Sequence, residues 1–225
     1  MRKNSFQSQV IYNLALLFFI FINPLRGEES EITLLKIKEN YSYIKSICKR
    51  LNINKEIFMA IVYTERTLNY DWEDEALDNL IASAGYNSSI GFCQIKIKTA
   101  YWIGKQIQDS SSVFFSGKDY CSLLPKISER EKLIDYLSND SLNILYAALY
   151  IKIISLRWKS DDIDISLNPE ILGTLYSTGL FYKDGTERKP RVNPVSNSFG
   201  MLVKKNYENI FKDFLNNHLR NNKRQ

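Results

Sequence analysis

Residues 52–68 read NINKEIFMAIVYTERTL, a stretch without Gly or Pro that predicts a helix. Asn52 and Asn54 offer N-cap chemistry at its start. Several apolar side chains and one acid fall on the same side of this helix, because residues three and four apart are neighbours on a helical surface. These side chains are Ile57, Phe58, Ile61, Val62 and Glu65. The segment therefore predicts a helix that carries a carboxylate on its apolar face.

The carboxylate of Glu65 has two interpretations. Burial of a carboxyl group disfavours its charged form and raises its pKa, and a group that stays protonated can act as a general acid. Alternatively, Glu65 lies at the edge of the apolar face and reaches water, or pairs with Arg66 or Lys55. The helix alone favours this second, structural interpretation.

Three further motifs follow this helix in order. Residues 88–95 read SSIGFCQI, residues 140–151 contain Asn143-Ile144, and residues 176–179 read YSTG. Together with residues 52–65 they resemble the soluble lytic transglycosylases and the goose-type lysozymes. In that family, a helix presents the catalytic Glu, a Ser-containing turn precedes Gly-Leu-Met-Gln, an Asn-Ile helix follows, and the last motif is Tyr-Asn-x-Gly.

The resemblance implies a mainly α, lysozyme-like helical domain with a substrate groove, in which Glu65 is the catalytic residue. It also implies five substrate-binding residues, which are Ser89, Phe92, Gln94, Asn143 and Tyr176. Gln94 would bind sugar or acetamido groups, and Tyr176 would form a hydrogen bond near Glu65. Without the family context, Gln94 would be an amide on a helix surface, and Phe92 and Tyr176 would be core aromatics.

The reaction implied by the resemblance is cleavage of the β-1,4 bond between N-acetylmuramic acid and N-acetylglucosamine in peptidoglycan. Glu65 would protonate the leaving oxygen and then act as the base on the muramyl 6-hydroxyl, giving a 1,6-anhydro product. A single carboxylate then serves both steps, unlike the pair used by most glycosidases. We expect peptidoglycan glycan strands as the partner, no nucleic acid, no metal and no cofactor.

A hydrolytic, goose-type muramidase is the nearest alternative, and it would need a second carboxylate to position water. The candidates for that role are Asp71, Glu73, Asp74 and Asp78. Two departures from the family pattern also leave open a catalytically inactive wall-binding protein: Arg66 stands where the family has Ser, and Ser177 where it has Asn. We expect Arg66 to be a solvated charge beside the site, or else a cation that opposes acid catalysis. An exported interaction protein of unrelated function is a third possibility.

Other apolar periodicities predict more helices. These cover residues 28–50, 91–104, 140–157, 169–179 and 199–219. Asp140 or Ser141 is expected to cap the long third one, and Pro169 and Gly179 to begin and stop the fourth. Residues 105–138 look like a looser insertion, and Ile95 and Ile97 also permit a strand. The pattern predicts one domain over residues 28–219.

The first 27 residues have the layout of a secretory signal peptide. Arg2 and Lys3 precede an apolar block at residues 10–22, which Asn23-Pro24 ends. This block is shorter than the ~20 residues that span a bilayer, so we expect cleavage near residue 28, with a retained membrane anchor as the alternative. The protein would then be exported, periplasmic or extracellular. Residues 220–225 form a basic polar tail.

Charge and composition exclude several functions. The 225-residue chain has a net charge of +5, and residues 1–27 contribute three positive charges and no negative ones. The rest is only weakly basic, which gives nucleic-acid binding no support. His218 is the single histidine and lies near the C-terminus, so a Ser-His-Asp triad or a His-ligated zinc site is not expected. Three cysteines allow at most one internal disulfide; otherwise they are small buried hydrophobes.

Overall fold

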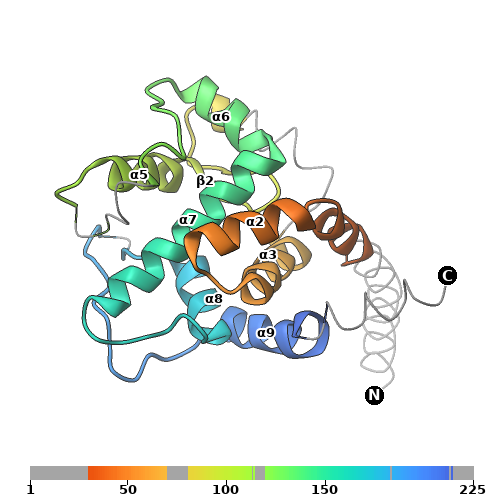
Figure 1. The fold of residues 1–225 in the computed structure, drawn as a ribbon. Helices are drawn as coiled ribbons and strands as arrows, with labels where there is room; N and C mark the ends of the chain where they lie inside the picture. The colour runs from red at the N-terminus through yellow and green to blue at the C-terminus, as the bar shows by residue number, and fades with distance from the viewer. Residues whose placement is uncertain are drawn as a thin grey trace, which may run out of the picture.

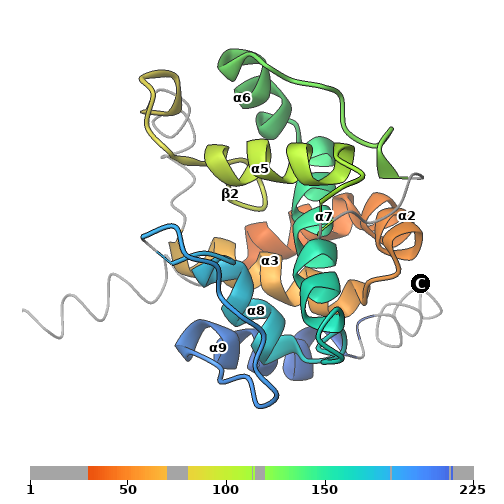
Figure 2. The same ribbon diagram turned by 90° about the vertical axis from the view of Figure 1, so that its left-hand side faces the viewer.

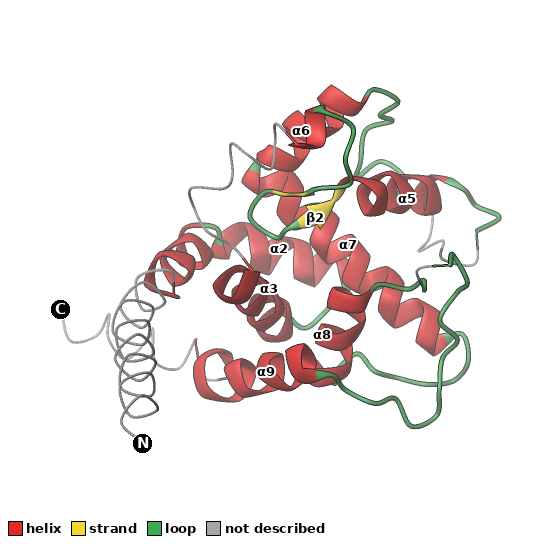
Figure 3. Ribbon diagram, turned by 180° about the vertical axis from the view of Figure 1, so that it is seen from behind, coloured by secondary structure: helices red, strands yellow, loops and turns green. Residues whose placement is uncertain are grey.

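The computed structural model describes residues 30–69, 81–112, 114, 120–182, 184–212 and 214. Within these ranges the chain is mainly α-helical with one small two-stranded sheet, as Figure 3 shows by colour, so the predicted α class is confirmed. The helices are α2 (Tyr41–Leu51), α3 (Lys55–Asn69), α5 (Ile97–Gln108), α6 (Arg130–Ser138), α7 (Asp140–Lys159), α8 (Pro169–Thr178) and α9 (Ser198–Asn206), followed by the π-helical turn η3 (Tyr207–Phe211).

Some sequence predictions fall outside the described residues. They concern the signal peptide, the acids of residues 71–78, His218 and the basic tail. Within the described ranges, no helix combines the length and the apolar character needed to cross a membrane.

Helix ends follow local capping chemistry. The Asn54 carboxamide oxygen accepts the N–H of Ile57 at 2.9 Å and opens α3. Asn139 caps α7 by accepting the N–H of Leu142 at 3.1 Å, so the predicted caps Asp140 and Ser141 were one or two residues too late. The helix predicted over residues 28–50 is divided: residues 30–39 are helical, a turn follows, and α2 begins at Tyr41.

Helix α7 forms the centre of the core. Buried residues cover all of its sides, from Asn143 to Trp158. It contacts α2, α5, α6 and α8, while α3 packs against α2, α8 and α9. Figures 1 and 2 show α7 running from the part of the molecule that holds α5 and α6 to the part that holds α8 and α9. The apolar face of α3 is therefore enclosed by helices from both halves of the sequence.

Helices α8 and α9 pack closely. A Cβ added to Gly200 of α9 would lie 2.1 Å from the backbone oxygen of Glu170 and 2.2 Å from the hydroxyl oxygen of Thr174. These distances are too short for any larger side chain. The close approach fixes α8, which carries part of the site described below.

A β-hairpin lies between α3 and α5 in the sequence. Strands β1 (Ser89–Ile90) and β2 (Ile95–Lys96) pair antiparallel, with Ser89 opposite Lys96 and Ile90 opposite Ile95. The helix expected between Gly91 and Gly104 was therefore placed too early, since α5 starts at Ile97 and runs through Gly104 to Gln108. The region expected to be a loose insertion contains α6.

Candidate active site

A cavity of about 250 Å³ lies where α3, the hairpin and α8 meet. Its lining includes Glu65 from α3, Ser89 and Gln94 from the hairpin, and Tyr176 from α8. These four residues, separated by up to 111 positions in the chain, are four of the six that the sequence predicted for the site. The fold thus gathers a carboxylate, an amide and two hydroxyl-bearing side chains around one space.

Glu65 follows a buried stretch of α3. Ile61 and Val62, one turn earlier on α3, are fully buried, whereas Glu65 is only half-buried and lines the cavity. Burial raises the pKa of the Tyr176 hydroxyl well above its usual range, and the nearby Cys93 thiol and Glu65 carboxylate add to this shift. The Glu65 carboxylate therefore contributes to the raised pKa of the Tyr176 hydroxyl.

Tyr176 ties α8 to the hairpin. Its hydroxyl donates a 2.7 Å hydrogen bond to the backbone oxygen of Cys93, and its ring is almost fully buried. The side chain thus closes the cavity on one side and holds the turn between β1 and β2 in place.

Gln94 lies at the end of that turn, in a left-handed backbone conformation with φ of 54°. Its side-chain amide donates to the backbone oxygen of Gly91 at 3.1 Å. The residue lines the cavity from a hairpin and not from a helix surface, which removes the structural alternative considered for it.

Asn143 is fully buried and acts on the turn instead of facing the cavity. Its side-chain oxygen accepts the N–H of Cys93 at 2.6 Å. Its side-chain nitrogen donates to the backbone oxygens of Ile90 and Leu137, each at 2.8 Å. Every hydrogen bond of its amide goes to the protein backbone, and substrate contact by Asn143 stays a prediction.

Phe92 is also buried, with 1% of its surface exposed, and its side chain does not line this cavity. Two cations lie near its ring: the Arg66 guanidinium carbon at 5.7 Å from the ring centroid and the Lys36 ammonium at 5.9 Å. Lys36 also forms a 3.1 Å ion pair with Asp140 at the start of α7. The Phe92 side chain therefore fills space in the core next to the hairpin.

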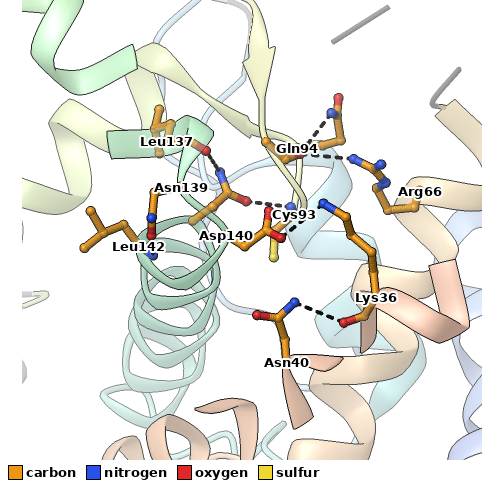
Figure 4. A network of polar contacts seen from close by, with 11 residues as sticks. Lys36, Asn40, Arg66, Cys93, Gln94, Leu137, Asn139, Asp140 and Leu142 are labelled. Atoms are coloured by element: carbon orange, nitrogen blue, oxygen red, sulfur yellow. Dashed lines mark hydrogen bonds and ion pairs between the residues drawn. The ribbon is translucent and has the colours of Figure 1, made fainter. Parts of the chain in front are cut away.

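Arg66 is 2% exposed, which contradicts the expectation of a solvated charge. One of its terminal nitrogens lies 3.5 Å from the backbone oxygen of Gly91, the same atom that accepts from Gln94 (Figure 4). The guanidinium group is thus directed toward the turn. Sequence gave no sign of this burial, because a helix position is placed against the hairpin only by the tertiary fold.

Ser177, the other departure from the family pattern, does line the cavity. Its hydroxyl donates to the backbone oxygen of Thr174 at 3.1 Å. Ser177 therefore adds a hydroxyl to the surface that a ligand would meet, whereas Arg66 supports the turn.

Aromatic residues that sequence reasoning did not select also shape the cavity. Phe181 and Tyr150 line it, and Phe181 is 38% exposed. Trp102 lies between them, with ring centroids 5.6 Å from Phe181 and 6.5 Å from Tyr150. The available signal was the aromatic pair that directly follows Gly179-Leu180, at the end of the last motif.

Cys48 and Cys93 behave as small buried hydrophobes, whereas Cys121 is half-buried and its thiol donates to the backbone oxygen of Ile107 at 3.3 Å. All three lie within the described ranges and form no disulfide. Burial raises the pKa of the Cys48 thiol to about 12 and that of the Cys93 thiol well above its usual range. In the described ranges, His, Cys, Asp and Glu form no cluster suited to a metal ion.

No protein-family model matches the chain, and no curated protein matches its sequence significantly.

Proposed function

We propose that the protein is a peptidoglycan lytic transglycosylase with a lysozyme-like fold and Glu65 as its catalytic acid and base. The observation that carries this proposal is the meeting of Glu65, Ser89, Gln94 and Tyr176 at one cavity. These four residues come from three of the four sequence motifs. An exported location and peptidoglycan glycan strands as the partner belong to the same proposal.

The reaction begins when Glu65 donates its proton to the glycosidic oxygen, so that the bond to the muramyl C1 breaks as positive charge develops on the sugar. The carboxylate then removes the proton of the muramyl 6-hydroxyl, whose oxygen closes on C1. General acid and base catalysis of this kind contributes roughly 10² to 10⁴ in rate. The Gln94 amide and the hydroxyls of Ser89 and Ser177 offer hydrogen bonds to the sugar.

The supported turn gives the cavity a fixed wall. Asn143 and Tyr176 hold Cys93 from two sides, and Arg66 and Gln94 approach the Gly91 oxygen. Since catalysis depends on holding reacting groups within a narrow range of positions, a rigid wall opposite Glu65 favours an enzyme over a loosely structured binding surface.

The transglycosylase route needs only one carboxylate at the site. Among the described lining residues, Glu65 is the one carboxylate, while the acids of residues 71–78 lie outside the described ranges. A single carboxylate suits the transglycosylase route, in which the same group acts twice.

Replacing Glu65 with Gln tests the proposal. Release of soluble fragments from dye-labelled peptidoglycan should fall by about 100-fold or more, because the amide cannot donate the proton. Glu56→Gln is the matched control, since Glu56 lies on the same helix and pairs with Lys55. It should retain wild-type activity. Equal activity of Glu65→Gln and wild type, or no release by wild type, would refute the proposal.

A further inference from the structure

A second cavity of about 320 Å³ lies beside the first. It is formed by the end of α7, by α8 and by the segment 182–195. Thr178, the last residue of α8, lines both cavities, so they lie on either side of the same helix end. Nothing in the proposed reaction uses this second space.

The second cavity carries positive charge. Arg188, Lys189 and Arg191 line it, and its described lining contains no Asp or Glu. The nearest acid in the sequence, Glu187, is already paired with Arg157 at 2.5 Å. The local excess of positive charge is therefore not neutralised by this neighbour, and an anion entering the cavity would be attracted.

Two buried N–H donors of this lining have no acceptor in the described part of the protein: the indole nitrogen of Trp158 and the Nε atom of Arg188. Trp158 is only 3% exposed. Buried donors normally find a partner, because an unmade hydrogen bond away from water is unfavourable. The hydroxyls of Thr174 and Thr178 donate to the backbone oxygens of Glu170 and Thr174, and neither accepts from these two N–H groups.

The position of Arg188 is fixed by its surroundings. Its backbone N–H donates to the oxygen of Leu180 at 2.8 Å, and its guanidinium carbon lies 4.1 Å from the centroid of the Tyr182 ring. A guanidinium group held on an aromatic ring is a preorganised donor for carboxylate or phosphate. The remaining lining is apolar and includes Ile171, Leu175 and Pro194.

We propose that this cavity is a second binding site, separate from the Glu65 cavity, for an organic anion: a carboxylate or phosphate group joined to an apolar body. The anionic group would accept from Arg188 and from the Trp158 indole, and the apolar body would lie on α8. The proposal does not depend on the proposed glycan cleavage.

The test measures binding of four probes to the full chain by isothermal titration calorimetry. Benzoate and phenyl phosphate carry both features, benzyl alcohol lacks the charge, and inorganic phosphate lacks the apolar body. We expect one or both organic anions to bind at least about tenfold more tightly than inorganic phosphate and benzyl alcohol, since both features contribute. Comparison of benzoate with phenyl phosphate tells which anionic group is preferred.

Two variants locate the site, and two more are controls. Arg188→Gln and Trp158→Phe each remove one donor and should weaken binding by about tenfold. Lys159→Gln is the control, because it removes a neighbouring positive charge that does not line this cavity. It should change binding by less than about twofold, since exposed charges are screened by salt. Glu65→Gln should bind the probes like wild type, which separates this proposal from the proposed function.

A second readout does not depend on affinity. The chain has three tryptophans, and comparison with Trp158→Phe identifies the indole N–H signal of Trp158 by nuclear magnetic resonance. That signal should shift when the anion binds. The proposal is overturned if neither organic anion binds the folded wild type, if benzyl alcohol binds equally well, if the indole signal does not move, or if Lys159→Gln weakens binding as much as Arg188→Gln.

Discussion

At the scale of single residues, Asn143 has the largest part in shaping the candidate active site. Its fully buried amide accepts the N–H of Cys93 and donates to the oxygen of Ile90, one on each side of the hairpin turn, and also donates to the oxygen of Leu137 in α6. A buried polar group left without its hydrogen-bond partner destabilises the folded protein by about 1–3 kcal/mol. Asn143 therefore affects the site through the backbone it holds, without facing the cavity.

Asn143→Ala should lower the free energy of unfolding by about 3 kcal/mol or more, because it leaves three backbone groups without partners. Urea denaturation measures this change. As a control, Asn139→Ala removes the N-cap of α7 and should lower the free energy of unfolding by only about 1 kcal/mol. A loss for Asn143→Ala no larger than that of the control would contradict the assigned role.

Tyr176→Phe keeps the ring and removes the hydroxyl that donates to Cys93. Because a buried backbone oxygen loses its donor, the unfolding free energy should fall by about 1–2 kcal/mol. Tyr86→Phe, at a 68% exposed position, is the control and should leave stability unchanged in the same thermal or urea experiment. If both variants were as stable as the wild type, the hydrogen bond from Tyr176 to Cys93 would not measurably stabilise the protein.

Sequence reasoning selected Glu65, Ser89, Gln94 and Tyr176, which do share a cavity. Asn143 and Phe92 are buried and do not line it, and the expectation of a solvated Arg66 was wrong. Motif position says that a residue belongs near the site, but whether its side chain faces the cavity or the core depends on how α7 and α3 pack against the hairpin. Arg66 shows this most clearly, since a charged residue was expected in solvent and is buried.

At the scale of secondary-structure elements, the turn between β1 and β2 depends on Gly91. Its φ is +73°, and an added Cβ would lie 2.1 Å from the backbone oxygen of Leu137 and 2.5 Å from the Asn143 amide nitrogen. The left-handed conformation suits glycine, and the close approach leaves no room for a side chain. Both the left-handed backbone conformation and the lack of space therefore disfavour any residue other than glycine at position 91.

Gly91→Ala should destabilise the protein by about 3 kcal/mol or more, through backbone strain and steric conflict together. Gly104→Ala is a matched control inside α5, where no atom lies within 4 Å of the added Cβ. It should raise stability by about 0.5–1 kcal/mol, since alanine favours a helix. Thermal unfolding of the two variants should shift in opposite directions, and shifts of the same sign would contradict this reading of the turn.

Helices were the most predictable elements, because their ends carry local signals. Asn54, Pro169 and Gly179 mark boundaries that the structure reproduces. Of the hairpin, only a strand at Ile95 was an alternative, because two strands of two residues leave little alternating pattern. The break at Asn40 was missed because apolar residues continue on both sides of it.

At the scale of the whole molecule, burial of the thiols makes stability depend on alkaline pH. Burial raises the pKa of Cys48 to about 12, while an unfolded cysteine titrates near 8.5. Above that lower value the unfolded chain loses a proton that the folded chain keeps. The stabilisation is therefore complete below about pH 8.5 and is lost as the pH rises toward 12.

The unfolding free energy should fall by about 1.4 kcal/mol per pH unit for Cys48 between about pH 9.5 and 11. Cys48→Ala should show a correspondingly shallower decline, even though its stability near neutral pH is lower. Urea denaturation under reducing conditions at several pH values measures both slopes. Identical slopes would mean that the Cys48 thiol titrates alike in the folded and unfolded states.

The overall α class was accessible from periodicity, but the arrangement of the cavities was not. Each cavity combines α8 with segments distant in sequence, and the helix end at Thr178 separates them. Only the tertiary fold brings Trp158 close to Arg188, or Glu65 close to Tyr176. This is why the sequence suggested one site through its motifs and gave no sign of the second.

The most direct test of the central claim is the product of peptidoglycan digestion. Purified peptidoglycan, treated with wild type or with Glu65→Gln, is analysed by mass spectrometry for the ends of the released glycans. We predict 1,6-anhydromuramic ends with wild type and none above background with Glu65→Gln. New reducing ends without anhydro ends would contradict the transglycosylase reaction, and anhydro ends formed equally by Glu65→Gln would contradict the role of Glu65.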